Sequence, residues 1–480
     1  MTRPGVDVQV TAAPARRGLP TDTGKLFLTA ITERGPVGTA VTVTSVADMV
    51  TTFGDRVSYG AGYDYAEAAF ANGVAEIVVS RVPGPAPVLG SLTRMDKAGS
   101  PVATLRFDAL TYGSYASRIK VQIAAGSTSA LYTVVVLFDD VEVERYEDLA
   151  NPGAAVTALA SSSYVRAADL ASGTSAPNNN PSTQAATALT GGTDDHSNVT
   201  ETQWTAALLA FGKALGPGQV AAAGRTTAGA RAALIGHAKA NNRTALLDAP
   251  DGTSATALIA LRNTDKAVSG SAQAAMFAPW VTIPGLTGDS LRTVQPSAVA
   301  AGLIAKSDAS RSTNQAAAGD PWGYPDSAVG LTGTPFTDAE RESLNAAGIN
   351  AFRMGPGGVQ LYGFRTISDD ANWVQLTWAR LRMELQAELT AAAEQFVFRQ
   401  INPGTIGDFR AALLGVLHPH FVEGALFGVR PEDAYDVDTG GGINTPTTLN
   451  AGELHARSWA VFSPFGERVV IDVTKSLIPA

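Results

Sequence analysis

The chain contains no cysteine, so disulfides and thiolate metal sites are excluded. Charged residues make up only 16% of its 480 residues, and the formal net charge is −9. Because phosphate backbones bind to basic surfaces, we expect no nucleic acid as a partner. No apolar run reaches the ~18 residues of a membrane span, and the first residues show no apolar signal segment. The composition therefore predicts a soluble cytosolic product of two or three domains.

Strand-like and helix-like patterns alternate over much of the chain. Buried-strand patterns occur at 26–30, 75–82, 218–223, 244–248 and 274–281, with helical patterns between them. This alternation predicts an α/β core in which a parallel sheet has helices on both faces.

A proline-rich segment at 83–87 and an Asn/Pro-rich segment at 175–181 enclose a block in which strand patterns dominate. Phe138–Val141 has the pattern of a tight hairpin within this block. The predicted layout comprises an N-terminal arm (1–20), an α/β segment of the core (21–85), an inserted β-rich outer domain (86–190), the α/β core domain (191–368), an α+β C-terminal inner domain (369–466) and a C-terminal arm strand (467–480).

The stretch from Ala347 to Gly428 organises the second half of the chain. Two strand patterns flank the glycine-rich turn 355–358, which predicts a hairpin. A long amphipathic helix should follow from about Asp370, with about 28 residues and roughly 42 Å of length. The segment 402–404 (Asn-Pro-Gly) should end it, and residues 405–408 resemble a capping box for a second helix.

Both ends of the chain carry period-2 strand patterns: Val6, Val8 and Val10 at one end, and Val469, Ile471 and Val473 at the other. A lone strand is not stable in water, so each must pair with a sheet of its own chain or of a neighbour. These six residues are the predicted inter-subunit interface.

Ser254, Asp248 and His237 could form the triad of a serine hydrolase. A triad needs its members to converge from separate elements, and Ser254 follows Asp248 by only six residues. Ser254 lies where a strand pattern gives way to a helix, which favours an N-cap, and Ser45 is likewise a predicted N-cap, for a helix from Val46.

Three further patterns resemble known functional sites. Asp438-Thr439-Gly440 matches the aspartic-protease triplet, but that chemistry needs two such carboxylates and the chain has one copy. His418 and His420 could approach a metal, yet no third ligand has suitable spacing. The glycines of 355–358 lack the Lys-Ser/Thr of a phosphate-binding loop. We therefore expect no catalytic residue, no cofactor and no metal site.

Several short motifs are similar to those of one family. The segment 361–368 reads LYGFRTIS and contains Gly363, Arg365 and Thr366, and Asn402-Pro403 follows the long helix. Further matches are Pro4-Gly5-Val6, Arg34-Gly35-Pro36, Phe53-Gly54, Asn72-Gly73, Arg81-Val82, Pro279-Trp280, Pro296-Ser297, Ala301-Gly302 and Asp308-Ala309-Ser310-Arg311. The chain resembles contractile tail sheath proteins of phages and related injection machines. Gln295 stands where the family has a second proline.

The resemblance implies a subtilisin-like-fold sheath domain and a structural function without enzymatic activity. Sheath subunits form a helical polymer of hexameric rings around an inner tail tube, and the polymer contracts to drive the tube through a cell envelope. Implied partners are other copies of the chain, the tail tube protein, and baseplate and tail terminator proteins. The implied place is a virion tail or injection-machine particle assembled in the bacterial cytoplasm. The resemblance also implies strand donation by the termini, and we expect the hairpin's sheet to accept those strands.

Two alternatives remain open from the sequence. One is a non-contractile tail or baseplate component. The other is a serine-type hydrolase that uses Ser254 on a subtilisin-like domain.

Overall fold

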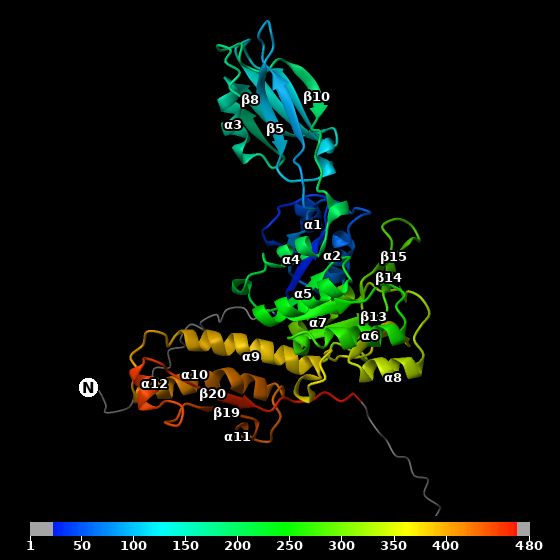
Figure 1. Ribbon diagram of the computed structural model, residues 1–480, viewed down its shortest axis with the longest axis vertical. Helices are drawn as coiled ribbons and strands as arrows, with labels where there is room; N and C mark the ends of the chain where they lie inside the picture. Colours follow the sequence, from blue (N-terminus) through cyan, green and yellow to red (C-terminus); the bar gives the residue numbers. More distant parts are fainter. Residues whose placement is uncertain (1–22, 468–480) are drawn as a thin grey trace, which may run out of the picture. The chain divides into compact units, whose positions relative to one another are not determined.

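The computed structural model describes residues 23–467, so the predicted arm residues Val6, Val8, Val10, Val469, Ile471 and Val473 lie outside the described part. The chain divides into two compact units (Figure 1). The core unit runs from Thr23 to Arg380, and the carboxy-terminal unit begins at Leu381. The division falls inside helix α9 (Leu376–Glu394).

An eight-stranded sheet forms the centre of the core unit. Its strand order is β18 (Gly358–Leu361), β17 (Ile349–Gly355), β13 (Ala274–Ala278), β12 (Thr244–Asp248), β11 (Gln219–Ala222), β1 (Leu26–Ala30), β3 (Ile77–Arg81) and β2 (Val41–Val43). The six inner strands are parallel, and β18 and β2 pair antiparallel at the two edges. All five residues of β1 are buried, as expected for a parallel strand that is covered on both faces of the sheet.

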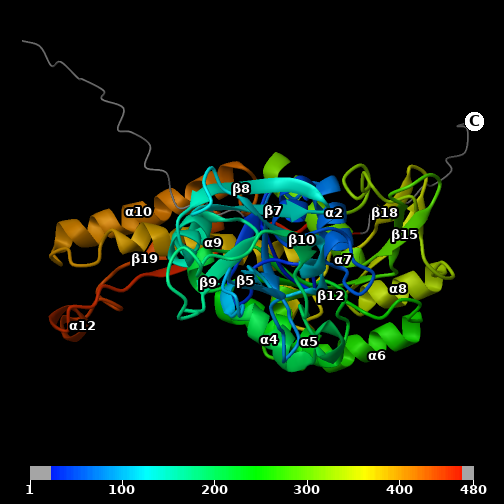
Figure 2. The same ribbon diagram turned by 90° about the horizontal axis from the view of Figure 1, so that it is seen from above.

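Helices cover both faces of this sheet (Figure 2). One layer consists of α4 (Glu201–Leu208), α5 (Ala228–Asn241), α6 (Ala255–Asp265) and α8 (Asp338–Ala346); the other consists of α1 (Val46–Phe53), α2 (Gly62–Ala71) and α7 (Pro296–Ser310). The predicted N-caps are confirmed: the Ser45 and Ser254 side chains accept hydrogen bonds from the backbone N–H of Asp48 and Ala257. A small antiparallel sheet, formed by β15 (Leu291–Val294), β14 (Val281–Pro284) and β16 (Gly330–Leu331), is appended.

The block between the two linkers is an antiparallel β structure with its own core. One sheet has the order β10 (Gln184–Ala188), β6 (Ile119–Ala125), β7 (Tyr132–Phe138), β8 (Val141–Leu149), and the other β4 (Ser91–Met95), β5 (Ala103–Ala109), β9 (Val165–Asp169). Helix α3 (Pro152–Ala158) also belongs to this block. The predicted hairpin at 138–141 is confirmed, and Asp139 and Asp140 form its turn with φ of 51° and 66°.

The two segments that join this block to the α/β sheet run side by side. Val88 and Thr193 exchange backbone hydrogen bonds of 2.8 and 2.9 Å, and the Gly84 N–H donates to the Asp194 carbonyl. At their base the guanidinium of Arg81 is fully buried. It donates to the carbonyl oxygens of Thr32, Glu33, Gly35 and Tyr112 at 2.7 to 3.2 Å and lies 3.4 Å from the Asp194 carboxylate.

The hairpin predicted around residues 355–358 is confirmed as β17 and β18, and it forms one edge of the main sheet. The outer side of β18 is not free: Leu361 donates to the Gly323 carbonyl (2.8 Å) and accepts from the Gly319 N–H (2.9 Å). This loop contact covers the edge at Leu361. We expected the hairpin's sheet to accept strands from neighbours, but at Leu361 this sheet has no open edge.

The long helix is shorter than predicted. Helix α9 has 19 residues instead of about 28, because Ala371–Trp373 form a separate 3-10 turn before it and residues 395–398 form a turn after it. The capping box expected at 405–408 is also wrong. Helix α10 (Pro403–Val422) begins earlier, and the Asn402 side chain caps it by accepting from the Thr405 N–H at 2.9 Å.

The carboxy-terminal unit packs the end of α9 and α10 against a two-stranded sheet of β19 (Tyr435–Asp438) and β20 (Arg457–Ala460). Short helices α11 (Pro431–Ala434) and α12 (Pro446–Asn450) complete it. Its core contains Leu381, Leu385, Phe396, Phe409, Leu413, Leu417, Leu426, Tyr435 and Val437. In α10, Phe409, Leu413 and Leu417 are buried, and Ile406 is partly buried.

Candidate assembly interface

The family-motif residues hold the chain in place after the hairpin. The Arg365 N–H donates to the Asn350 side-chain oxygen (2.6 Å), and the Asn350 amide group donates to the carbonyls of Arg365 and Met276. The Thr366 hydroxyl donates to the Trp373 carbonyl at 2.6 Å. Gly363 packs so closely that a Cβ would lie 3.2 Å from the Asn350 Cα. These residues fix backbone conformation and present no reactive group.

A glycine is required just before β17. Gly348 has φ +73°, and a Cβ there would lie 2.2 Å from the Thr366 carbonyl oxygen. Together with Asn402 as the cap of α10 and Pro403 as its first residue, the motif reads as a set of structural anchors.

The structure does not bring Ser254, Asp248 and His237 together as a triad. Ser254 caps α6. The His237 ring contacts the buried Arg243 guanidinium at 2.8 Å, and burial together with that charge lowers its pKa to about 4. No hydrogen bond among residues 23–467 joins His237 to either of the other two.

Asp248 has a different environment at the carboxyl end of β12. Its carboxylate accepts from the Ser297 N–H (3.0 Å), the Ser297 hydroxyl (2.5 Å) and the Gln295 side-chain amide (2.8 Å). The Tyr65 hydroxyl lies 2.6 Å from the Ser297 hydroxyl. Burial raises the pKa of Asp248 to about 7, and the bonds from Ser297 and Gln295 act in the opposite direction. The residue joins β12 to the start of α7.

The remaining candidates from the sequence have local partners. The Asp438 carboxylate accepts from the Gly440 N–H at 2.7 Å, an Asx-type turn. His418 contacts the Tyr435 hydroxyl (2.8 Å), whereas His420 contacts the Glu388 carboxylate (2.7 Å). Within the described part of the chain, no three His, Asp or Glu side chains are placed to hold a metal ion.

The sheet of the carboxy-terminal unit has an open edge. The Val461 N–H donates to the Ala434 carbonyl and the Val461 carbonyl accepts from Phe427, so alternate residues of this strand face β19. The backbone groups of Ser458 and Ala460 therefore face away from it. Among residues 23–467 these two have no backbone partner on that side.

The opposite edge of the same sheet is partly covered. The Arg410 side chain of α10 donates to the Val437 carbonyl of β19 at 2.7 Å and to the Asp436 carboxylate at 2.6 Å. An added strand would thus meet free backbone groups along β20 and an occupied carbonyl along β19.

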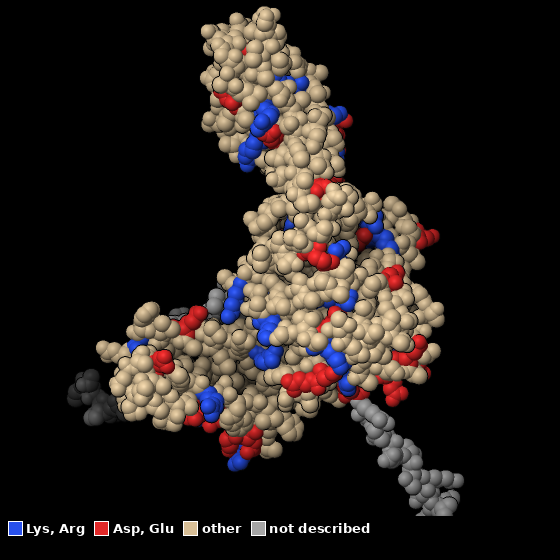
Figure 3. Space-filling model, in the orientation of Figure 1, with Lys and Arg blue, Asp and Glu red and all other residues tan. Residues whose placement is uncertain are grey.

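Large apolar side chains are exposed on the carboxy-terminal unit. Those with the greatest exposure are Val397, Phe398, Val422, Phe427, Val429, Trp459 and Val461. Where such side chains adjoin in one patch, they mark a surface that associates with other molecules. Charged side chains lie singly or in small groups of both signs on the face shown in Figure 3, with no extended basic surface there.

Comparisons with models of known protein families and with curated proteins find no match. Solved structures do match. A sheath tail protein from Desulfitobacterium hafniense is similar with a TM-score of 0.62 and 15% identity, over 91% of this chain and 93% of that one. A sheath tail protein from Listeria innocua gives 0.62 and 14%, over 93% and 97%. The fold is that of a contractile sheath protein.

The similarity extends to injection machines over almost the full length. The sheath of the extracellular contractile injection system PVC, solved in its contracted state, has a TM-score of 0.59 and 16% identity, over 99% of this chain and 98% of that one. The sheath fold here combines a mixed parallel and antiparallel sheet with helices. Among residues 23–467, no helix is long and apolar enough to cross a membrane.

The sequence reasoning missed three features of this sheath fold. It did not single out Arg81 as a buried hub, although an arginine that ends a buried, mostly apolar strand is a signal for one. It did not find the β20 edge, because RSWA is too short and does not alternate. It also did not single out Phe398, whose side chain is fully exposed.

Proposed function

We propose that the chain is the subunit of a contractile sheath, a helical polymer that surrounds an inner tube and shortens to drive it through a cell envelope. The observation that carries the proposal is the likeness to sheath chains of tails and injection machines over more than nine-tenths of both chains. The place of action is a virion tail or injection-machine particle, assembled in the bacterial cytoplasm. The described residues add no arrangement that would favour serine hydrolysis at Ser254.

The proposal includes the finer layout. The α/β sheet corresponds to a subtilisin-like sheath domain, the block 86–190 to an outer domain, and the unit from Leu381 to the inner domain. Partners are further copies in hexameric rings, a tail tube protein, and baseplate and tail terminator proteins. The open β20 edge and the exposed apolar side chains of the carboxy-terminal unit support extensive contacts with such partners.

The terminal segments are the proposed links between subunits. Strands containing Val6, Val8 and Val10, or Val469, Ile471 and Val473, add to the β19–β20 sheet of a neighbour at Ser458 and Ala460. Strand addition uses main-chain hydrogen bonds, so it depends little on side-chain identity. Trp459 and Val461 are half-exposed in this strand and offer apolar surface to the valines and the isoleucine.

Electron microscopy of the purified protein, alone and with its tube protein, tests the function. We expect hollow striated cylinders of two lengths, the long form around the tube and the short form after contraction. Cylinders of one length only would favour a non-contractile tail component, and discs or single rings would favour a baseplate component. Monodisperse globular particles under all conditions would contradict a sheath.

A further inference from the structure

The loop between α9 and α10 holds an aromatic side chain out in solvent. Phe398 is fully exposed, and its backbone has φ 64°, a conformation that costs a bulky residue energy. Two positions earlier, Phe396 is buried and packs on the Phe409 ring at 5.0 Å. The loop is therefore anchored to the core of its unit while Phe398 points outward.

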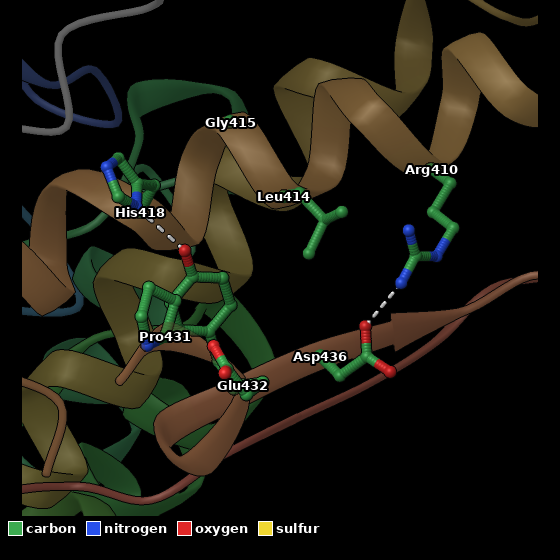
Figure 4. Close-up of a pocket in the computed structure, with 8 residues that line it drawn as sticks. Arg410, Leu414, Gly415, His418, Pro431, Glu432 and Asp436 are labelled. Atoms are coloured by element: carbon green, nitrogen blue, oxygen red, sulfur yellow. Dashed lines mark hydrogen bonds and ion pairs between the residues drawn. The ribbon is translucent and has the colours of Figure 1, made fainter. Parts of the chain in front are cut away.

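A groove of about 480 Å³ lies between α10 and β19 in the same unit (Figure 4). Leu414, Pro431 and Tyr435 give it apolar walls. The Arg410–Asp436 ion pair lies at one end, and the bond from His418 to the Tyr435 hydroxyl at the other. A cavity of about 150 Å³ is enough to bind benzene, so the groove has room for a phenyl ring.

The charges next to the ring and next to the groove are complementary. Arg399 follows Phe398 and is half-exposed, and its ion pair with Asp408 is long at 3.6 Å. The groove presents the carboxylates of Glu432 and Asp436, which pair with Arg430 (3.2 Å) and Arg410 (2.6 Å) of their own chain but are both more than 40% exposed. An apolar ring followed by a cation thus matches apolar walls beside two carboxylates that solvent, and a further cation, can reach.

The ring and the groove of one copy are held apart by α10. Phe398 precedes the start of this helix, and Leu414 lies 11 residues after Pro403, which is roughly 17 Å along the axis. Because Phe398 is fully exposed and is not among the groove's lining residues, it does not fill the groove of its own copy. We propose that Phe398 of one copy inserts into the groove between α10 and β19 of the next copy.

This contact joins two different surfaces, so it repeats without closing on itself unless the rotation completes a ring. It deepens the proposed sheath function by naming a side-chain contact between subunits, separate from the donated strands. The aromatic ring acts as the buried anchor, and Arg399 as the charged group that orients it on the Glu432 side.

The absence of cysteine makes this contact directly testable by crosslinking. Phe398→Cys and Leu414→Cys in one chain, treated with a short bis-maleimide after assembly, should give a ladder of covalent oligomers on a denaturing gel. Each single variant should give nothing larger than a dimer. The matched control combines Phe398→Cys with Val422→Cys, an exposed site on α10 outside the groove lining, and should give no ladder.

Two further variants measure the energetics. Phe398→Ala should raise the protein concentration needed for assembly by roughly 10- to 30-fold, as for an interface hot spot. Leu209→Ala, at a highly exposed apolar site of the core unit, is the control and should leave it unchanged. Arg399→Glu should weaken assembly, and adding Glu432→Arg should restore it.

The outcomes separate this contact from the sheath function. If the wild type forms cylinders, the double-cysteine variant gives no ladder and Phe398→Ala assembles normally, the contact is overturned. The sheath function would remain intact. Crosslinking of Phe398→Cys to the tube protein would also overturn the contact. Failure of the wild-type chain to form any polymer would contradict the sheath function itself.

Discussion

One edge strand in each compact unit, β18 in the core unit and β20 in the carboxy-terminal unit, differs in whether its outer backbone groups have partners. In the core unit, the outer side of β18 is bonded at Leu361 to a loop of the same chain. In the carboxy-terminal unit, β20 leaves the backbone groups of Ser458 and Ala460 without partners among residues 23–467. An open edge invites pairing with another strand, so the difference separates an edge that its own chain closes, at β18, from an edge that can associate, at β20.

The largest effect is expected from removing the amino-terminal arm. Deleting residues 1–20 should abolish polymerisation and leave a folded monomer, because the first core strand begins only at Leu26. Sedimentation and electron microscopy report polymerisation, and circular dichroism with thermal melting reports folding. Normal cylinders from the truncated chain would show that strand donation by this arm is not needed.

Proline substitutions at the two edges separate an effect on assembly from an effect on folding. Ala460→Pro removes an outward N–H and should block assembly at least about 10-fold with little change in monomer stability. Leu361→Pro removes the bond to Gly323 and a fully buried side chain, so it should destabilise the fold by roughly 4 kcal/mol. The thermal melt of the monomer and the critical concentration for assembly distinguish the two effects.

If Ala460→Pro assembled like the wild type, the donated strand would have to pair elsewhere. If it melted as early as Leu361→Pro, the edge would have a role in folding. Either result would remove the contrast between the units.

The buried carboxylate of Asp248 in the core unit should make stability depend on pH. Burial raises its pKa to about 7 in the folded state, whereas the ordinary pKa is 3.8. Between these two pH values, the folded state holds a proton that the unfolded state has released. Stability is therefore lost as pH rises from about 4 to 7, by on the order of 2 to 4 kcal/mol. Denaturant unfolding of the arm-deleted monomer should show this slope, and Asp248→Asn should remove it. Parallel curves for the two proteins would contradict the assignment.

The smallest effect is expected from His420 in the carboxy-terminal unit. Burial alone would lower its pKa, but the bond to Glu388 and the charges of Glu384 and Glu423 outweigh it and raise the pKa. The resulting stabilisation is present below pH 6.5 and is lost as pH rises through the higher folded-state value. His420→Gln should cost roughly 1 kcal/mol at pH 6 and almost nothing at pH 9. An equal cost at both pH values would mean that the ring acts by packing alone.

The sequence predicted the features that local patterns determine. The alternation of strands and helices, the N-caps Ser45 and Ser254, and the hairpins at 138–141 and 355–358 follow from side-chain period and turn chemistry, and the structure has all of them. The resemblance to sheath proteins also pointed to the fold found by comparison. The subtilisin-like description and the domain boundaries stay predictions.

The features that failed depend on contacts between distant residues. The length of α9 was overestimated because apolar residues at helical spacing extend beyond both of its ends, to Val374 before Leu376 and to Phe396 after Glu394. Asn402 was read as a stop signal, although the same residue type is a good N-cap for the helix that follows. The covered edge at Leu361 depends on a loop some forty positions earlier in the chain, which no local pattern reveals.

Arg81 has a consequence for engineering. Its guanidinium donates to main-chain oxygens of Thr32, Glu33 and Gly35 in the core and of Tyr112 in the inserted block, and its one side-chain partner among residues 23–467 is the Asp194 carboxylate. Because four of these five partners are main-chain oxygens, this contact depends little on the side chains around it. A foreign domain spliced between the paired segments at Val88 and Thr193 should fold on this base if its loop offers one carbonyl at the position of Tyr112, which makes the block a cassette for displaying new domains.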